Sequence, residues 1–195
     1  MVRMMLIAVL LPVAAVAQKN YDPNTQVRFG LMKGNLTIAP GWDMHEGRTN
    51  IYLHGILSYY MSRRIALESD AYYFIDTQGD GRLMHNHNVF FGFSYHRPYR
   101  RFDPYIGLQP GIALIQMHRP DTDLIDTWVT ESRLKPAPAI SATLGFNFYV
   151  WKYVHFMGQL RYVHAEHPVE WGETLPLDEF RLSFGISWNV NTVRL

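Results

Sequence analysis

From Phe180 to Val190 the chain alternates apolar residues with polar or small ones, without interruption. A strict period of two predicts a β-strand with one apolar face and one polar face. The apolar face is bulky and aromatic, whereas the polar face is mostly small, with Arg181 as its one charged residue. This combination is typical of a strand that meets lipid on one side and a narrow polar lumen on the other.

The same alternation recurs along the chain and predicts eight strands. Their expected ranges are 26–38, 49–61, 65–75, 86–96, 104–117, 136–150, 153–165 and 178–190. Most are long enough to cross a bilayer at a tilt, which needs about 9–11 residues. The predicted fold is therefore all-β: an eight-stranded antiparallel transmembrane β-barrel in up-and-down meander order.

The connections between these strands alternate in length. Small outer-membrane barrels have short periplasmic turns and longer extracellular loops. An even number of strands then predicts that both termini lie in the periplasm. The short connections are rich in arginine and the long ones in acids. The short ones are Ser62–Arg64, Arg97–Asp103 and Trp151–Lys152, and the long ones are Ala39–Arg48, Asp76–His85, His118–Lys135 and Glu166–Leu177.

The N-terminus has the features of a secretory signal peptide. Arg3 supplies a positive charge, Met4–Val16 is an apolar run too short to span a bilayer, and Ala15–Ala17 matches a cleavage site. Cleavage there divides the chain into a signal peptide, residues 1–17, and a barrel, residues 18–195. The alternative is an uncleaved anchor helix.

The composition excludes several classes of function. The chain has 195 residues, no cysteine and a formal net charge of +1, so neither disulfides nor a nucleic-acid partner is expected, and no cofactor is indicated. Aromatic residues make up 14% and gather near the expected strand ends, where they predict interfacial girdles. At the turn end these are Tyr59, Tyr60, Tyr95, Tyr99, Tyr105, Tyr149, Trp151, Tyr153 and Trp188, and at the loop end Tyr72, Tyr73, Phe74 and Tyr162.

Together with segments such as Pro104–Ala113, these features resemble the small outer-membrane barrels of the OmpA/OmpX type. The resemblance implies a place in the bacterial outer membrane, contact with membrane lipid and lipopolysaccharide, and insertion by the barrel-assembly machinery. One feature departs from it. Such barrels often end in an aromatic residue, whereas here Trp188 is followed by Asn189–Leu195.

Four charged residues fall on the polar faces of the predicted strands. Glu68 and Asp70 lie in the third strand, Arg161 in the seventh and Arg181 in the eighth. An eight-stranded barrel is only wide enough for side chains, and buried charges must be paired. We therefore expect a carboxylate–guanidinium network that plugs the lumen. In the alternative, the third strand is shifted by one residue and exposes both acids to lipid.

The segment around His164 resembles the outer-membrane lipid A deacylases, which are also eight-stranded barrels. In that family a His, a Ser two residues later and a Glu at the start of the next strand form the hydrolytic set. Here Arg161–His164 fits the His segment and Glu179 lies near the Glu position, but Glu166 stands where Ser is required. A carboxylate does not replace that nucleophile. The resemblance therefore implies a degenerate site.

A second pair of histidines, His85 and His87, lies two residues apart and so shares one face of the fourth strand. With Asp76 and Asp80 from the preceding loop they form a weak candidate metal site. A polar loop without a metal is the simpler interpretation.

We interpret the sequence as a non-enzymatic outer-membrane barrel with a structural or surface-contact role. Its candidate contact surface is the longest loop, His118–Lys135, with Trp128, whose ligand the sequence does not identify. Two alternatives stay open: a lipid A-modifying acyl hydrolase, and a soluble lipocalin-like barrel in which Phe184 and Trp188 line a cavity.

Overall fold

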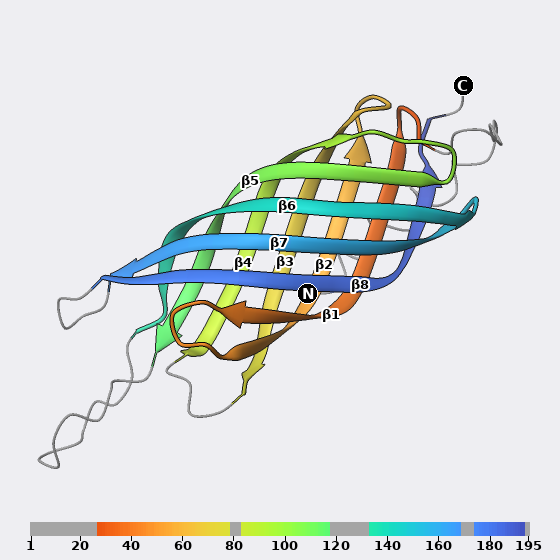
Figure 1. The fold of residues 1–195 in the computed structure, drawn as a ribbon. Coiled ribbons are helices and arrows are strands. Elements are labelled where there is room, and N and C mark those ends of the chain that lie inside the picture. Colours follow the sequence, from red (N-terminus) through yellow and green to blue (C-terminus); the bar gives the residue numbers. More distant parts are fainter. Residues whose placement is uncertain (1–26, 79–82, 118–132, 169–173, 194–195) are drawn as a thin grey trace, which may run out of the picture.

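A computed structural model describes residues 27–78, 83–117, 133–168 and 174–193 as one closed barrel of eight antiparallel strands (Figure 1). This confirms the predicted fold. The predicted signal peptide and most of the loop His118–Lys135, including Trp128, lie outside the described residues. The strands are β1 (Leu31–Asp43), β2 (Thr49–Tyr60), β3 (Ile65–Thr77), β4 (Leu83–His96), β5 (Phe102–Met117), β6 (Lys135–Trp151), β7 (Val154–Pro168) and β8 (Thr174–Asn191).

Each strand pairs with its neighbour in sequence, and β1 pairs with β8 to close the ring. A closed ring leaves no unpaired strand edge, which a sheet in hydrocarbon requires. Within the described ranges, no helix has both the length and the apolar character needed to cross a membrane.

The first strand lies later in the sequence than predicted: it was expected at 26–38 and runs from Leu31 to Asp43. Pro40 and Gly41 fall within the predicted connection Ala39–Arg48, but both are paired with β2. Pro40 has no N–H to donate, and on its other side the β1–β8 pairing is interrupted between Asn35 and Gly41. The proline therefore costs no hydrogen bond at this position.

The strands also continue further than predicted at the loop end. The connection Glu166–Leu177 was expected to be a loop, yet β7 reaches Pro168 and β8 begins at Thr174, with Ala165 opposite Leu177. A hairpin that continues in register extends the barrel wall. Of the four connections at this end, the one between β5 and β6 is by far the longest.

The part of the barrel nearer the short turns, called here the membrane section, has an apolar exterior and a polar interior. Leu144, Phe184 and Ile186 point outward and are largely exposed, whereas Asn147 and Ser183 are buried in the lumen. The lipocalin-like alternative is therefore wrong, because Phe184 and Trp188 point outward with 63% and 45% of their surface exposed.

The part nearer the loops, called here the projecting section, has the opposite polarity. Its outward positions include Gln116, His164, Glu166 and Asp178. Its interior holds a cluster of apolar side chains, next to the buried amides of Asn50 and Asn86. The cluster includes Ala39, Phe74, Leu83, Ile115, Met117, Ala137, Val163, Ala165 and Leu177.

Several tyrosines predicted for the interfacial girdles lie in the lumen instead. Tyr60, Tyr72, Tyr105 and Tyr149 are buried, because they occupy inward positions of their strands. Gly145 makes room for one of them: a Cβ there would lie 2.5 Å from the Tyr105 ring. Tyr95, Tyr99 and Trp151 are exposed at the turn end, as a girdle requires.

Candidate functional site

The centre of the lumen holds a buried ion pair between β7 and β3. Arg161 Nη2 lies 2.7 Å from Asp70 Oδ1, and both side chains are almost completely excluded from solvent. His54 Nε2, from β2, lies 3.1 Å from the same oxygen, and its Nδ1 lies 2.8 Å from Ser183 Oγ. Side chains of three strands thus meet at the Asp70 carboxylate, which joins opposite walls of the barrel, and Ser183 of β8 is linked to it through His54.

Arg161 extends this network across the lumen. Its Nη1 donates to Gln109 Oε1 and to Ser141 Oγ, each at 2.7 Å. The guanidinium carbon also lies 5.0 Å from the centre of the Phe90 ring, within range of a cation–π contact. The charge of a fully buried arginine is thereby matched by an anion, two neutral acceptors and an aromatic face.

A second group of acids lies toward the turn end. Glu68 accepts from Gln109 Nε2 at 3.2 Å and from Ser58 Oγ at 3.2 Å. His96 lies between two carboxylates: its Nε2 is 3.8 Å from Glu68, and its Nδ1 is 2.9 Å from Asp103. Asp103 Oδ2 also accepts from the hydroxyl of Tyr60 at 2.6 Å.

A third group lies toward the loop end, below the apolar cluster of the projecting section. Arg181 Nη2 and Nε donate to Glu179 Oε2 at 2.7 and 2.8 Å. The Tyr52 hydroxyl and Asn50 Nδ2 donate to the same carboxylate. The guanidinium of Arg181 stacks over the Tyr52 ring at 4.1 Å.

All four residues proposed for the lumen network are thus buried inside the barrel, with Asp70 bound to Arg161. Glu68 is joined to this pair through Gln109, and Arg181 has a different partner, Glu179. The sequence did not assign further buried polar residues to the network, among them Lys33, Asn35, His54, His96, Asp103 and His155. The period of two in β2 would have indicated His54, because Tyr52, Ser58 and Tyr60 share its parity.

The network borders one small cavity. The cavity bordered by Lys33, Glu68, Tyr105 and His155 has a volume of about 10 Å³, room for about one water molecule. At the turn end, the buried side chains of Val27 and Leu31 pack with Tyr60 and Tyr149. Polar layers in the middle of the lumen are thus bounded by apolar clusters at both ends.

The residues of the deacylase-like segment do not come together. His164 points outward and is partly exposed, whereas Glu179 points into the lumen and binds Arg181. The residue opposite His164 is Asp178, whose Oδ1 lies 2.7 Å from His164 Nδ1. Glu166, at the position where the family has its nucleophile, is exposed and lies 4.0 Å from His164 Nε2.

Asp178 is instead the centre of a cluster on the outside of the projecting section. Its Oδ1 also accepts from the Tyr162 hydroxyl at 2.6 Å, and its Oδ2 lies 2.9 Å from His45 Nε2. His45 belongs to the connection between β1 and β2, and the neighbouring Met44 N–H donates to the Asp178 carbonyl at 2.9 Å. This rim cluster, consisting of His45, Tyr162, His164 and Asp178, attaches the β1–β2 connection to β8.

His85 and His87 share the outward face of β4, as their spacing predicts, and their rings stack at 5.5 Å. The Phe74 N–H donates to His87 Nδ1 at 3.1 Å, and the His87 ring stacks on Tyr73. A neutral imidazole that accepts at Nδ1 carries its proton on Nε2 and has no free lone pair for a metal. Asp80 lies outside the described residues, and in the described part of the chain no group of three His, Asp or Glu side chains is arranged to hold a metal ion.

The fold places the chain among proteins of known structure. It is similar to the N-terminal β-barrel domain of OprF from Pseudomonas aeruginosa, with a TM-score of 0.57 and 12% identity, covering 83% of this chain and 98% of that one. It is also similar to the outer membrane protein OprG of Pseudomonas aeruginosa, with a TM-score of 0.58 and 14% identity over 86% and 99% of the two chains.

A third similar structure is Ail, the attachment invasion locus protein of Yersinia pestis, with a TM-score of 0.55 and 8% identity over 83% and 99% of the two chains. No protein-family model and no curated protein sequence matches the chain. At these identities the likeness shows the fold alone. The chain therefore has the fold of the small eight-stranded outer-membrane β-barrels.

Proposed function

We propose that this protein is an integral bacterial outer-membrane β-barrel with a closed lumen and a non-enzymatic role. The role is structural or consists of contacts made by its loop end. The observation that carries the proposal is the polarity of the membrane section, where large apolar side chains face outward and charged side chains are paired inside. Only an apolar solvent outside the barrel makes that arrangement stable.

A closed lumen is supported by the side chains that cross it. Arg161 forms an ion pair with Asp70, and Arg181 forms one with Glu179. Both guanidinium groups also stack on aromatic rings, so moving either side chain out of the lumen would cost free energy. Opening a water-filled path would break these pairs and hydrate the apolar clusters at both ends. We therefore expect no large, stable conductance.

The enzyme alternative has less support. His164 has a carboxylate partner in Asp178, but Glu166 stands where a serine nucleophile is needed, and Glu179 points to the other side of the wall. We assign the rim cluster a structural role instead, in which it positions the β1–β2 connection. In this proposal the loop end faces lipopolysaccharide and the cell exterior, both termini lie in the periplasm, and the assembly machinery inserts the barrel.

Membrane integration is tested by extraction and by labelling. The protein is expected to stay with the envelope in carbonate buffer and to migrate differently on gels before and after boiling. A light-activated lipid probe should label Leu144 and Ile186 but leave Asn147 and Ser183 unlabelled. Labelling of the second pair, or release into buffer, would refute the proposal.

Planar-bilayer recordings test the closed lumen separately. The wild-type protein should give no stable conductance, whereas removal of the Arg161 guanidinium in Arg161→Ala should produce openings. A large, steady conductance of the wild type would contradict the closed lumen and leave membrane integration untouched.

A further inference from the structure

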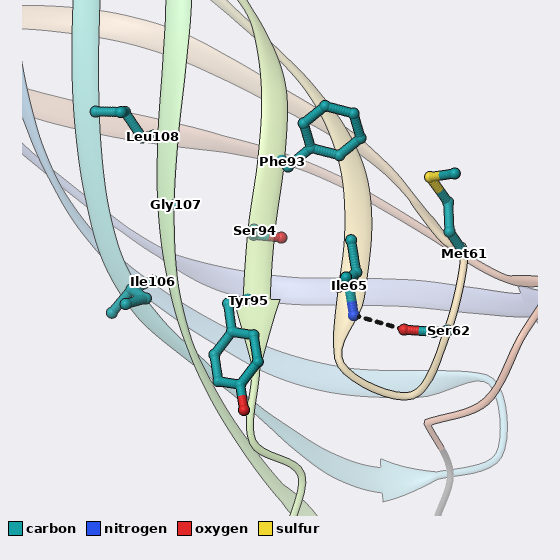
Figure 2. A pocket seen from close by; sticks show the side chains of 9 residues that line it. All are labelled: Met61, Ser62, Ile65, Phe93, Ser94, Tyr95, Ile106, Gly107 and Leu108. Atoms are coloured by element: carbon teal, nitrogen blue, oxygen red, sulfur yellow. Dashed lines mark hydrogen bonds between the residues drawn. The ribbon is translucent and has the colours of Figure 1, made fainter.

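An apolar groove lies on the exterior of the membrane section at its turn end (Figure 2). It has a volume of about 800 Å³ and is bordered by the 61–64 turn and by β3, β4 and β5. Figure 2 shows the Tyr95 hydroxyl directed toward the end of β4, away from the apolar side chains. Those side chains are Met61, Ile65, Phe93, Ile106 and Leu108.

Two basic turns lie next to this groove, whose lining includes Met61 and Ser62 of the first turn. Arg63 and Arg64 lie in the 61–64 turn, and Arg97, Arg100 and Arg101 lie in the connection between β4 and β5. The His96 N–H donates to the Arg64 carbonyl at 2.7 Å, which holds the two turns side by side.

All five guanidinium groups belong to exposed residues. Among the described residues, none of them forms an ion pair with a carboxylate. The nearest acid in sequence, Asp103, is buried in the lumen, where it binds Tyr60, His96 and Asn147. The turns thus carry positive charge that the described protein leaves uncompensated.

We propose that the groove binds one anionic glycerophospholipid, with an acyl chain along the apolar lining and the phosphate between the two arginine turns. This inference rests on the proposed function, since it requires the barrel to sit in a bilayer. Guanidinium groups bind phosphate through paired hydrogen bonds, and basic residues at a membrane surface attract anionic lipid. The hollow lets the acyl chain contact the protein on several sides, which a flat wall does not.

A second copy of the chain fits the same surface less well. A symmetric dimer through the groove would place the same patch on both partners, so ten arginines would face one another across the contact. The repulsion between them disfavours that contact, whereas a phosphate neutralises it.

Native mass spectrometry of the full chain in a nonionic detergent tests the proposal. Phosphatidylglycerol and phosphatidylcholine with identical acyl chains are titrated separately, and the wild type should retain one phosphatidylglycerol preferentially. The variant Arg63→Gln/Arg64→Gln/Arg97→Gln should lose about fivefold in apparent affinity per arginine, or roughly a hundredfold in total. The variant Arg48→Gln/Arg133→Gln/Lys135→Gln removes the same charge from the loop end and should bind normally.

A second pair of variants tests the groove rather than the charge. Ile65→Trp places an indole in the groove and should lose most of the bound phosphatidylglycerol. Leu160→Trp makes a similar addition on the lipid-facing side of β7, where Leu160 is 44% exposed compared with 45% for Ile65, and should retain it. The gel shift on boiling, recorded for every variant, shows that the barrel is folded before its lipid is counted.

Equal retention of the two lipids by the wild type would overturn the proposal, as would equal losses in the two triple variants or in the two tryptophan variants. A dimer that disappears in Ile65→Trp would assign the groove to a second copy instead. Failure of the proposed function looks different, because the protein would then leave the membrane in carbonate. A barrel that stays in the membrane without lipid preference refutes the groove site alone.

Discussion

The membrane section and the projecting section are built from the same strands, yet their faces have opposite polarity. Along β7, the outward positions change from Phe156 and Leu160 to His164 and Glu166. The inward positions change from Gln159 and Arg161 to Val163 and Ala165. The strand keeps its phase throughout, so the side chains continue to alternate in and out.

This difference shows which solvent each section meets. Where lipid surrounds the wall, polar residues have only the lumen in which to find partners, and they form the buried ion pairs. Where water surrounds the wall, polar residues move outside and apolar ones fill the interior, as in a soluble barrel. The change in polarity, near Tyr162 and Phe180 on β7 and β8, is where we expect the membrane boundary to lie.

The largest expected effect comes from breaking the central ion pair of the membrane section. Arg161→Leu leaves Asp70 buried without its guanidinium and should lower the free energy of unfolding by about 3–5 kcal/mol. Urea unfolding of the folded protein in lipid vesicles measures the change. The double variant Arg161→Leu/Asp70→Asn should recover part of the loss, because the uncompensated charge is gone.

Arg48→Leu is the matched control in the projecting section. Arg48 forms a partly exposed pair with Glu46 at 3.6 Å, and such pairs contribute about 0–1 kcal/mol. If Arg48→Leu destabilised the protein as much as Arg161→Leu, that result would contradict the inference that lipid surrounds the membrane section and water surrounds the projecting section.

A charge placed on the outward face should have a smaller and position-dependent effect. Phe184→Arg puts a guanidinium into the middle of the apolar exterior and should cost about 2–4 kcal/mol of unfolding free energy. Gln116→Arg makes the same addition on the outward face of the projecting section and should cost close to nothing. Equal costs, measured by the same urea titration, would contradict the proposed membrane boundary.

The fold was predictable because most of the strands alternate clearly, although the first two alternate less cleanly than the rest. The sixth strand, with Leu144 and Phe148 opposite Thr143 and Asn147, gave the correct faces directly. The first strand was misplaced, with Pro40 in the predicted connection; a proline fits inside this strand because the β1–β8 pairing is interrupted beside it. That interruption depends on a strand at the other end of the sequence.

The sequence indicated that charged side chains lie in the lumen, but not which of them form ion pairs. Parity identifies which charges enter the lumen, but not which of them meet, since pairing depends on barrel register and side-chain length. Arg181 thus binds Glu179 on its own strand rather than Glu68 or Asp70. The prediction for the tyrosines was wrong for a related reason. Tyr105 and Tyr149 are of the residue type found in interfacial girdles, but they occupy inward positions of their strands.

The smallest expected effect comes from the rim cluster of the projecting section. Asp178→Asn removes the carboxylate that holds His45, Tyr162 and His164, but these groups are partly exposed and can be hydrated instead. We expect a loss of at most about 1 kcal/mol of unfolding free energy.

The local effect of Asp178→Asn should be larger than the global one. Releasing His45 loosens the β1–β2 connection, so trypsin should cleave after Arg48 faster than in the wild type, while Glu166→Gln, which removes an exposed acid from the same rim, serves as the control. A global loss as large as that of Arg161→Leu would mean that Asp178 lies in an apolar solvent. The membrane boundary would then have to be moved beyond the rim cluster, toward the loops.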